Sequence, residues 1–506
     1  MSLKTSILSN YLSQTYVILI GIVMVPVYVK YMGAEAYGLV GFFSMSQLWF
    51  NLLDMGLTST LARETARFRG GNIDPVIFRS LVRVLEGVFL VMTVLGGTVL
   101  FMASDYLAND WLQVAKLPTD QVRTSIQLMA AIIALRMMGG LYRGAISGFE
   151  RMAWLAGFNS FIATLRYVGV LPLLLYVGAT PTVFFSFQFL VACVELIGLI
   201  IYAYHLMPAL GVADKLSLRW ALLKPVVRFS VSIAFTSVVW VFITQTDKLI
   251  LSKILSLEEY GYFVLTVLLA SGVTVISGPI SASIMPRLAA LEGLGDHDGL
   301  IRIYRQATQL VAVISGATAF TISICAEQLL QIWTGDQILA KQAVPVLVLY
   351  ALGNCVLSVS AFPYYLQYAK GDMRLHVLGN LVFALLFVPI IIMASVAYGS
   401  VGAGYVWLGM NVVSFFVWLP FVHKKFEPGL NLKWYWNDVG VILISAALAG
   451  WVAASFLPAS DQLIPALVKL LAVGGSTLLV GAVASTALRR IARDWRFSRL
   501  KEKAGR

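Results

Sequence analysis

Charged residues are scarce in this chain, and so are histidine and cysteine. Only 12% of its 506 residues are Asp, Glu, Lys or Arg, and it contains four His and three Cys. A soluble domain needs a charged, hydrated surface, so this composition excludes one soluble core. Cys193, Cys325 and Cys355 lie in apolar segments without CxxC or CxxH spacing, and we interpret them as small core residues. We therefore predict no disulfide and no metal site.

Enzyme signatures are missing as well. The chain has no P-loop, no HExxH and no Gly-x-Ser-x-Gly motif. Asp296-His297-Asp298 imitates the acidic metal-binding triplet of glycosyltransferases, but it lies between Gly295 and Gly299 in a short loop, which favours a solvated turn. We predict a protein that is not an enzyme and holds no cofactor. Without an ATPase domain, its energy would come from an ion gradient or a sugar-lipid gradient.

Long apolar runs, by contrast, recur from one end of the chain to the other. Hydrophobic residues make up 59% of the sequence, and a helix needs about 20 apolar residues to cross a bilayer. The sequence therefore predicts an all-α polytopic membrane protein with about 14 membrane helices. The predicted segments are 7–29, 39–60, 81–103, 125–147, 154–177, 182–204, 226–251, 260–284, 306–326, 343–366, 377–398, 401–422, 439–457 and 463–487.

Lys and Arg predict the orientation of these segments. Most of the 37 basic residues fall at one side of the predicted membrane. The other side has only Lys30, Lys116, Arg123, Lys253 and Lys341. By the positive-inside rule the richer side is cytoplasmic, which places both termini in the cytoplasm. We interpret the basic tail as attracted to anionic lipid rather than to nucleic acid.

A repeated motif divides the chain. Lys30-Tyr31-Met32-Gly33-Ala34-Glu35-Ala36-Tyr37-Gly38 has a counterpart 223 residues later in Lys253–Gly261, which ends in Glu258-Glu259-Tyr260-Gly261. Gly148–Arg151 and Gly371–Arg374 match at the same offset. These matches predict two pseudo-symmetric six-helix lobes, the parallel-repeat plan of many transporters. The predicted parts are lobe 1–206, linker 207–224, lobe 225–424, an extra helix pair 425–488 and a tail 489–506.

Polar residues crowd the first two predicted helices of each lobe. Hydrocarbon tolerates them only where they face a partner helix or a watery cavity. Two interpretations stay open. The polar side chains either form hydrogen bonds between packed helices or line one shared central cavity. For the set as a whole we favour the cavity. The predicted cavity-lining residues are Asn10, Gln14, Gln47, Asn51 and Gln245.

Charges inside the predicted helices cost about 2.5–3.5 kcal/mol each near the bilayer centre, so they indicate function. Arg136 and Arg166 lie near mid-depth, and with Lys248 they are candidates to bind an anion, because an Arg fork suits phosphate. In the alternative, Glu195 neutralises one arginine as a structural pair. The candidate ion-coupling carboxylates are Asp54, Glu86, Glu195 and Asp247.

The motif Tyr31-Met32-Gly33-x-Glu35-x-Tyr37-Gly38, and Thr246-Asp247-Lys248-Leu249 before Tyr260-Gly261, resemble the polysaccharide transporters. These belong to the multidrug/oligosaccharidyl-lipid/polysaccharide exporter superfamily. Within it the chain is similar to flippases of O-antigen or other repeat units.

This resemblance implies alternating access between two lobes. The substrate would be an undecaprenyl-diphosphate-linked oligosaccharide of O-antigen, lipopolysaccharide or exopolysaccharide synthesis, moved across the bacterial inner membrane by ion antiport. Partners would be a polysaccharide polymerase and a chain-length regulator. A lipid II flippase ranks second. A multidrug or cation antiporter would usually have twelve helices and an acidic cavity, and a non-transporting scaffold would not need a polar centre.

Overall fold

The structure is a computed structural model that describes residues 3–209, 224–457, 462–490 and 493. Regular structure in these ranges is helical, apart from an isolated bridge between Gln113 and Ser256. Residues 210–223 of the predicted linker and most of the predicted tail 489–506 lie outside the described residues.

The chain divides into two compact units, Met1–Val264 and Leu265–Arg506, with α11 running from one into the other. The helices of the first unit are α1 (Leu3–Met32), α2 (Ala34–Phe50), η1 (Asn51–Asp54), α3 (Leu57–Arg69), α4 (Pro75–Met102), α5 (Ser104–Tyr106), η2 (Leu107–Trp111), α6 (Thr119–Gly148), α7 (Met152–Tyr167), α8 (Leu171–Tyr176), α9 (Pro181–Leu206), α10 (Lys224–Ile254) and the start of α11 (Leu257–Gly293).

The second unit contains the remaining helices. They are α12 (His297–Ile324), α13 (Ala326–Thr334), α14 (Gln337–Ser360), α15 (Phe362–Ala369), α16 (Arg374–Val413), η4 (Ser414–Trp418), α17 (Leu419–Phe426), α18 (Asn431–Lys433), η5 (Trp434–Gly440), α19 (Val441–Phe456) and α20 (Leu463–Ala484).

The prediction of an all-α polytopic membrane protein is confirmed. Eleven stretches among the described residues are long and apolar enough to cross a membrane. One of them, Arg374–Phe426, is 53 residues long and covers two predicted segments. Its helix α16 is interrupted at Gly399, whose φ of 59° and ψ of −142° are not helical. Every predicted segment overlaps a helix, while the count of fourteen stays a prediction.

The predicted segment 39–60 is broken in the structure. Met55 (φ 47°) and Gly56 (φ 75°) adopt the left-handed conformation between η1 and α3, which ends one helix and starts another. The Asp54 carboxylate accepts hydrogen bonds from the backbone N–H and the hydroxyl of Thr58, at 3.0 and 2.9 Å. It thereby satisfies an N–H of the first turn of α3 that has no helical partner.

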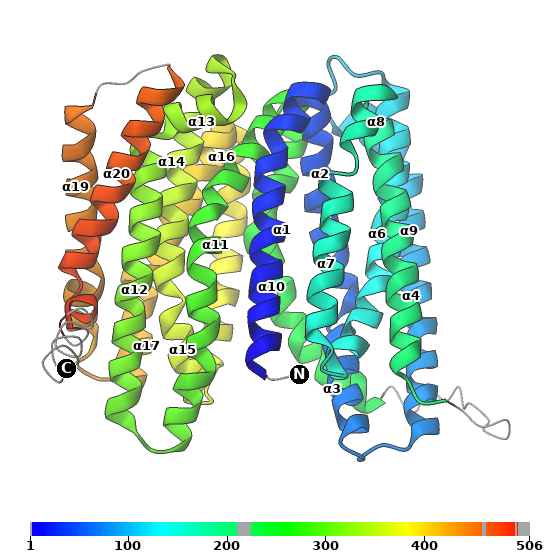
Figure 1. The fold of residues 1–506 in the computed structure, drawn as a ribbon, viewed down its shortest axis with the longest axis horizontal. Coiled ribbons are helices and arrows are strands. Elements are labelled where there is room, and N and C mark those ends of the chain that lie inside the picture. Colours follow the sequence, from blue (N-terminus) through cyan, green and yellow to red (C-terminus); the bar gives the residue numbers. More distant parts are fainter. Residues whose placement is uncertain (1–2, 210–223, 458–461, 491–492, 494–506) are drawn as a thin grey trace, which may run out of the picture. The chain divides into compact units, whose positions relative to one another are not determined.

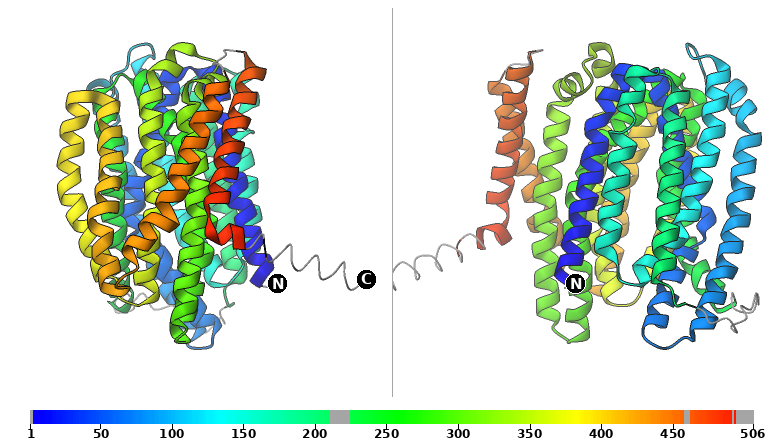
Figure 2. Two further views of the ribbon diagram at one scale, coloured as in Figure 1. Left: turned by 90° about the vertical axis from the view of Figure 1, so that its left-hand side faces the viewer. Right: turned by 45° about the vertical axis from the view of Figure 1, so that its right-hand side comes forward.

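Helix α6 is the centre of the first unit and packs against α3, α4 and α9, while α1 runs beside α7 (Figure 1 and the right-hand view of Figure 2). Small residues of α6 allow a close approach of α3. A Cβ on Gly144 would lie 2.4 Å from the Thr58 carbonyl oxygen, and one on Gly148 would lie 2.4 Å from that of Ala62. These glycines let α3 approach the backbone of α6.

In the second unit, α19 and α20 are attached to α12 through a buried carboxylate. Asp438, fully buried, accepts two hydrogen bonds from Arg305 (2.6 and 3.1 Å) and one from Gln309 (2.6 Å). The Gln309 amide oxygen then accepts from the hydroxyl groups of Ser485 and Thr486. Because this network is satisfied inside the protein, it fixes the last two long helices to their own unit.

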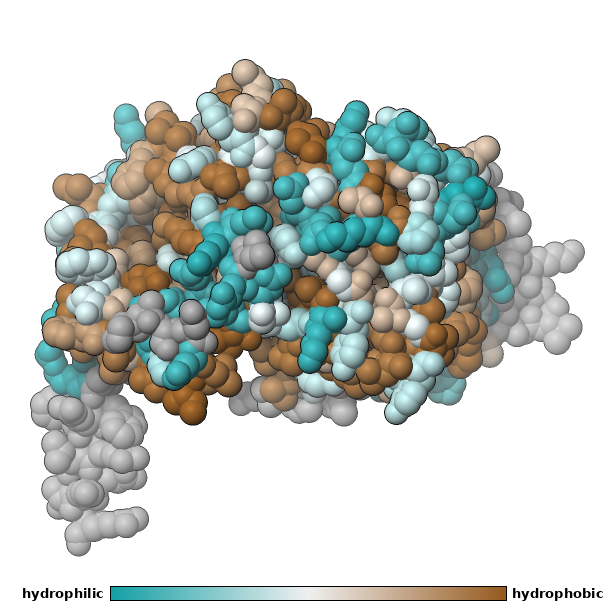
Figure 3. All heavy atoms as spheres, turned by 90° about the horizontal axis from the view of Figure 1, so that it is seen from above, coloured by the Kyte–Doolittle hydropathy of each residue, from teal (hydrophilic) through white to brown (hydrophobic). Residues whose placement is uncertain are grey.

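Large apolar side chains are exposed along many helices, as a membrane protein requires. Leu95, Val99, Leu385 and Leu471 are examples, each more than 60% exposed. The face seen from above mixes hydrophilic and hydrophobic residues, with hydrophilic residues gathered over its middle (Figure 3). The apolar flanks suit contact with lipid tails.

The two copies of the repeated motif pack against each other within the first unit. A Cβ on Gly38 would lie 2.2 Å from the Leu257 carbonyl oxygen, and one on Gly261 would lie 2.3 Å from that of Ala34. Ala34 and Leu257 are counterparts at the repeat offset, as are Gly38 and Gly261. The contact between α2 and the first turns of α11 is therefore reciprocal, with each motif supplying a glycine and a carbonyl.

The loop before α6 is held by the acidic residues of both motifs. The buried Glu35 carboxylate accepts the backbone N–H groups of Ala115 and Lys116 at 2.6 and 3.0 Å. The Lys116 ammonium donates to Glu258 at 2.5 Å, and this hydrogen bond raises the pKa of Lys116. Lys116 therefore stays charged at neutral pH. The glutamates of the repeat are thus structural supports of this loop.

We predict that Gly261→Ala destabilises the protein by about 1–3 kcal/mol, the usual cost of overpacking. The new methyl group would lie 2.3 Å from the rigid Ala34 carbonyl oxygen. Thermal unfolding of the purified protein in detergent measures the effect. Gly272→Ala on the same helix is the matched control, because its Cβ would have nothing within 4 Å. Equal melting temperatures for the two variants would contradict the reciprocal contact.

Candidate functional site

Three neighbouring helices of the first unit each carry two polar residues seven positions apart. Seven residues correspond to about two helical turns, so the members of each pair lie on one face. The pairs are Arg136 and Arg143 on α6, Asn159 and Arg166 on α7, and Gln188 and Glu195 on α9. Contacts among α6, α7 and α9 bring the three polar faces together.

Glu195 is the common partner of the arginines. Its Oε2 accepts a hydrogen bond from Arg166 Nη2 at 3.0 Å, and its Oε1 accepts one from Arg143. Arg136 Nε lies 4.0 Å from the same Oε2. One carboxylate thus faces three guanidinium groups. The site keeps two positive charges in excess, since Arg side chains stay protonated.

This charge is placed deep in the helix bundle. The side chains of Arg136 and Glu195 are only 9% and 7% exposed. Arg136 lies over the Phe43 ring, 5.2 Å from its centroid, and its Nη1 donates to Gln47 at 2.9 Å. Burial of unbalanced charge is costly, which makes such a site a candidate for binding an anion.

Two of the arginines have buried donors without a hydrogen-bond acceptor among the described residues. These are Nε and Nη2 of Arg136 and Nε of Arg166. Gln188 donates to the Arg166 backbone carbonyl at 2.9 Å, and within the described ranges its own amide oxygen also lacks a partner. Because buried polar atoms are normally satisfied, these atoms make the site a candidate for binding a ligand.

Two pockets meet at Arg166. The first, which we call the arginine pocket, has a volume of about 310 Å³. It is lined by Tyr28, Val40, Phe43, Ser44, Gln47, Leu48, Arg136, Arg166, Tyr167, Phe184 and Gln188. Its charged residues are Arg136 and Arg166, its other polar residues include Ser44, Gln47 and Gln188, and the rest of its lining is aromatic and aliphatic.

The second pocket, which we call the amide pocket, has a volume of about 390 Å³. It is lined by Asn10, Ser13, Gln14, Val17, Ile18, Arg143, Asn159, Ile162, Ala163, Arg166 and Glu195. Arg143 donates to both Asn159 and Glu195, so its guanidinium group is already engaged in ion pairing. Its charged groups, Arg143, Arg166 and Glu195, are paired with one another, and its other polar lining is Asn10, Ser13, Gln14 and Asn159.

The structure thus brings together several residues that the sequence analysis selected. Arg136 and Gln47 line the arginine pocket, Asn10, Gln14 and Glu195 line the amide pocket, and Arg166 lines both. Of the two interpretations of the arginines, the ion pair of Glu195 with Arg166 is present at 3.0 Å, while anion binding stays a prediction.

Other selected residues lie elsewhere. On α10, Lys248 donates to the neighbouring Asp247 carboxylate at 3.2 Å and to the Thr244 carbonyl at 2.8 Å. Gln245 donates to the Thr244 hydroxyl at 3.3 Å. Lys248 is therefore engaged with its own helix instead of with the arginine cluster. Asn51 is exposed at the start of η1.

Two of the candidate coupling carboxylates have local structural partners. The Asp54 carboxylate accepts a hydrogen bond from the backbone N–H of Thr58 in the first turn of α3. Glu86 accepts hydrogen bonds from the hydroxyl groups of Tyr142 (3.0 Å) and Tyr204 (2.6 Å) and from Arg83 (2.9 Å). A carboxylate with three donors is well satisfied, and Glu86 ties α4 to α6 and α9.

The candidates selected from the sequence did not include Arg143, Asn159 and Gln188. Each of them is seven residues from a residue of the same site, so the spacing along each helix was the available signal. Arg143 lies nearer than Arg136 to the end of α6. Basic residues are common at the ends of membrane helices, so its position alone did not indicate a functional role.

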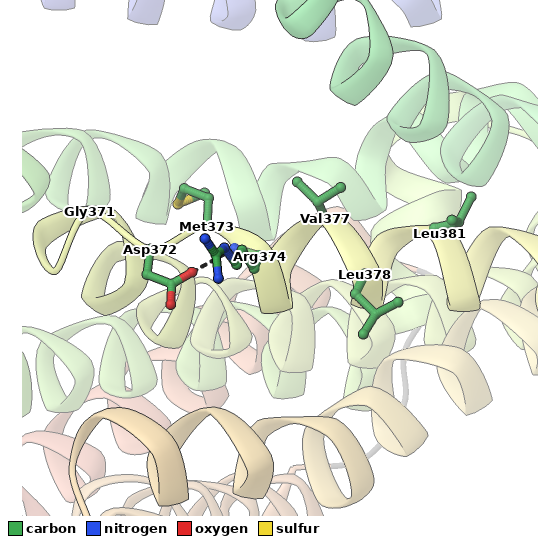
Figure 4. Close-up of a pocket in the computed structure, with 7 residues that line it drawn as sticks. All are labelled: Gly371, Asp372, Met373, Arg374, Val377, Leu378 and Leu381. Carbon is green, nitrogen blue, oxygen red and sulfur yellow. Dashed lines mark hydrogen bonds between the residues drawn. The ribbon is translucent and has the colours of Figure 1, made fainter.

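A further pocket of about 720 Å³ lies in the second unit at the start of α16 (Figure 4). Asp372 accepts the backbone N–H of Arg374 at 3.1 Å and pairs with Lys425 at 2.5 Å. The bond to Lys425 lowers the pKa of Asp372. Val377, Leu378 and Leu381 follow along the helix (Figure 4). Because its carboxylate is already neutralised, we assign no ligand to this pocket.

The fold is similar to those of several solved membrane transporters. The lipid II flippase MurJ in an inward closed conformation superposes with a TM-score of 0.73 at 12% identity, covering 95% of this chain and 98% of that one. An inward-facing multidrug resistance MATE transporter gives 0.67 at 15% identity over 84% and 99% of the two chains. A superfamily transporter from Pyrococcus furiosus, described as having a binding pocket of reverse polarity, gives 0.57 at 15% identity over 83% and 95%.

The sequence identifies the family. Residues 3–292, more than half of the chain, match the model of the polysaccharide biosynthesis protein family, and the chain belongs to that family. No curated protein matches it in sequence. The resemblance inferred from the Tyr-Gly motifs is thus confirmed.

We predict that Glu195→Gln destabilises the protein by about 3–5 kcal/mol, the usual cost of leaving buried charge without its partner. Three guanidinium groups would then face a neutral amide. Adding Arg143→Gln removes one of them, so the double variant should recover part of the lost melting temperature. A double-mutant cycle measured by thermal unfolding tests this coupling. Strict additivity would show that Arg143 and Glu195 do not interact energetically.

Proposed function

We propose that this protein is a flippase that moves a lipid-linked oligosaccharide diphosphate across the membrane. The proposal is carried by Arg136 and Arg166, which have buried donor atoms without an acceptor among the described residues, in a member of a polysaccharide biosynthesis family. A planar guanidinium forms bidentate bonds to phosphate oxygens and keeps its charge when buried. A diphosphate would satisfy the open donors and balance the excess positive charge.

The substrate class that we propose is an undecaprenyl-diphosphate-linked repeat unit of O-antigen, lipopolysaccharide or exopolysaccharide. The membrane is the bacterial inner membrane, and transport proceeds by alternating access between the lobes. A polymerase and a chain-length regulator would act on the product. The excess positive charge argues against a cation-drug antiporter, because it would repel a cationic substrate.

A lipid II flippase is the second candidate. It is favoured by the similarity to MurJ over 95% of the chain. Both substrates carry a diphosphate on a polyprenol, so the arginine site fits both. Proteoliposomes loaded with either lipid II or a lipid-linked O-antigen repeat unit separate the two functions by which lipid is flipped.

We predict that Arg136→Gln and Arg166→Gln each abolish flipping, measured as translocation of a lipid-linked repeat unit in proteoliposomes. Each change removes one guanidinium group that would bind the diphosphate. Arg136→Lys keeps the charge but loses the bidentate geometry, and it should retain part of the activity. Arg123→Gln is the matched control, because Arg123 is about half exposed and pairs with Asp105 in the loop region. Wild-type flipping in both test variants would remove the anion site from the proposal.

We further propose that Glu195 carries the coupling proton, in preference to Asp54, Glu86 and Asp247. Glu195 is bonded to Arg143 and Arg166, and Arg166 is one of the substrate-binding arginines. When phosphate binds Arg166, it competes with Glu195 for this arginine and weakens their ion pair. A carboxylate that loses a cationic partner binds a proton more readily. Substrate binding would thus be linked to proton uptake at one residue.

The test uses the double variant Arg143→Gln/Glu195→Gln, in which one positive and one negative charge are removed together. We predict that flipping by this variant no longer accelerates when a proton gradient is imposed across the proteoliposome. Arg143→Gln alone is the control and should keep its response, since Glu195 still pairs with Arg166. A double variant that responds like the wild type would exclude Glu195 as the coupling site.

A further inference from the structure

The two pockets that share Arg166 differ in chemistry, and this difference suggests that each pocket binds a different part of the substrate. We propose that the amide pocket binds the sugar next to the diphosphate, while the arginine pocket holds the diphosphate itself. This inference rests on the proposed function and deepens it, because it names the side chains that would recognise the glycan.

The charges direct the diphosphate to the arginine pocket. There, Arg136 and Arg166 have buried N–H groups that find no acceptor in the described part of the chain. In the amide pocket, Arg143 is engaged by Asn159 and Glu195, and the Glu195 carboxylate would repel phosphate. A neutral group is therefore the better occupant of the amide pocket, and a sugar is the neutral group that is joined to the diphosphate.

The amide pocket carries the groups that sugar hydroxyls need. Asn10 and Gln14 line it, and within the described residues neither side chain has a hydrogen-bond partner. Each amide offers two donor hydrogens and an acceptor oxygen, so each can bond a hydroxyl in either direction. Ser13 is less available, because its hydroxyl already donates to the Ala156 carbonyl at 2.7 Å.

The apolar residues of the amide pocket complete the match. Val17 and Ile18 on α1 face the same pocket as Ile162 and Ala163 on α7. They can pack against the C–H face of a sugar ring while the amides bond its hydroxyls. Pockets that bind small molecules combine apolar walls with a few placed polar groups and span about 300–1,000 Å³. A volume of about 390 Å³ falls within that range.

The lining of the arginine pocket agrees with this arrangement. Its other walls include Tyr28, Phe43, Leu48 and Phe184. Aromatic and aliphatic side chains suit the first isoprene units on the lipid side of a diphosphate. The order lipid, diphosphate, sugar along the substrate would then follow the order from the arginine pocket, past Arg166, to the amide pocket.

The test compares two soluble probes, farnesyl diphosphate and farnesyl diphosphate that carries one N-acetylglucosamine. Binding to the purified full-length protein in detergent is measured for the wild type and for Gln14→Met and Asn10→Leu, which keep side-chain volume but lose the amide. We expect each variant to bind the sugar-bearing probe about 5–10-fold more weakly, the loss of one or two hydrogen bonds. Binding of the sugar-free probe should stay unchanged and also shows that the variants are folded.

Gln47→Met is the matched control, since Gln47 bonds Arg136 in the arginine pocket. It should weaken both probes equally. If Gln14→Met and Asn10→Leu leave both probes unaffected, or weaken both to the same extent, the amide pocket is not a sugar site. Failure of the proposed function looks different, because the wild type would then bind neither probe, or Arg136→Gln would not weaken the sugar-free one.

Discussion

The ion pairing of Glu195 with the surrounding arginines is the interaction on which the rest of the site depends. In a medium of low dielectric constant, three guanidinium groups repel one another strongly unless a carboxylate is shared among them. Glu195 occupies that position, with Arg143 and Arg166 bonded to its two oxygens and Arg136 at 4.0 Å. Because a single carboxylate cannot neutralise three cations, the site remains positive. Nε and Nη2 of Arg136 and Nε of Arg166 have no hydrogen-bond acceptor among the described residues.

The scaffold around this cluster is made rigid by close backbone contacts and satisfied polar groups. Gly144 and Gly148 bring α3 against α6, and Glu86 connects α4 with α6 and α9. The reciprocal contact of Gly38 and Gly261 joins the two motif copies at the starts of α2 and α11. A charged cluster needs such support, since its side chains must hold their geometry when no ligand balances them.

Much of the fold could be predicted because the membrane imposes simple rules. Apolar runs of sufficient length located the helices, and the break at Gly399 was anticipated between two predicted segments. The break at Met55 and Gly56 was not, since the apolar pattern continues through it and only backbone conformation interrupts the helix. Arg136, Arg166 and Glu195 were selected from their cost in hydrocarbon, whereas Arg143 and Asn159 were missed because their importance depends on which helix faces which.

The sequence by itself determined the class of protein, the family and the presence of unbalanced charge within the helices, because composition and hydropathy govern insertion into a bilayer. Tertiary structure alone decided which charges meet. Arg143, Arg166 and Glu195 come from three helices, and their pairing follows from the rotation and crossing of α6, α7 and α9. Side-chain packing sets that rotation, and no pattern within one helix encodes it.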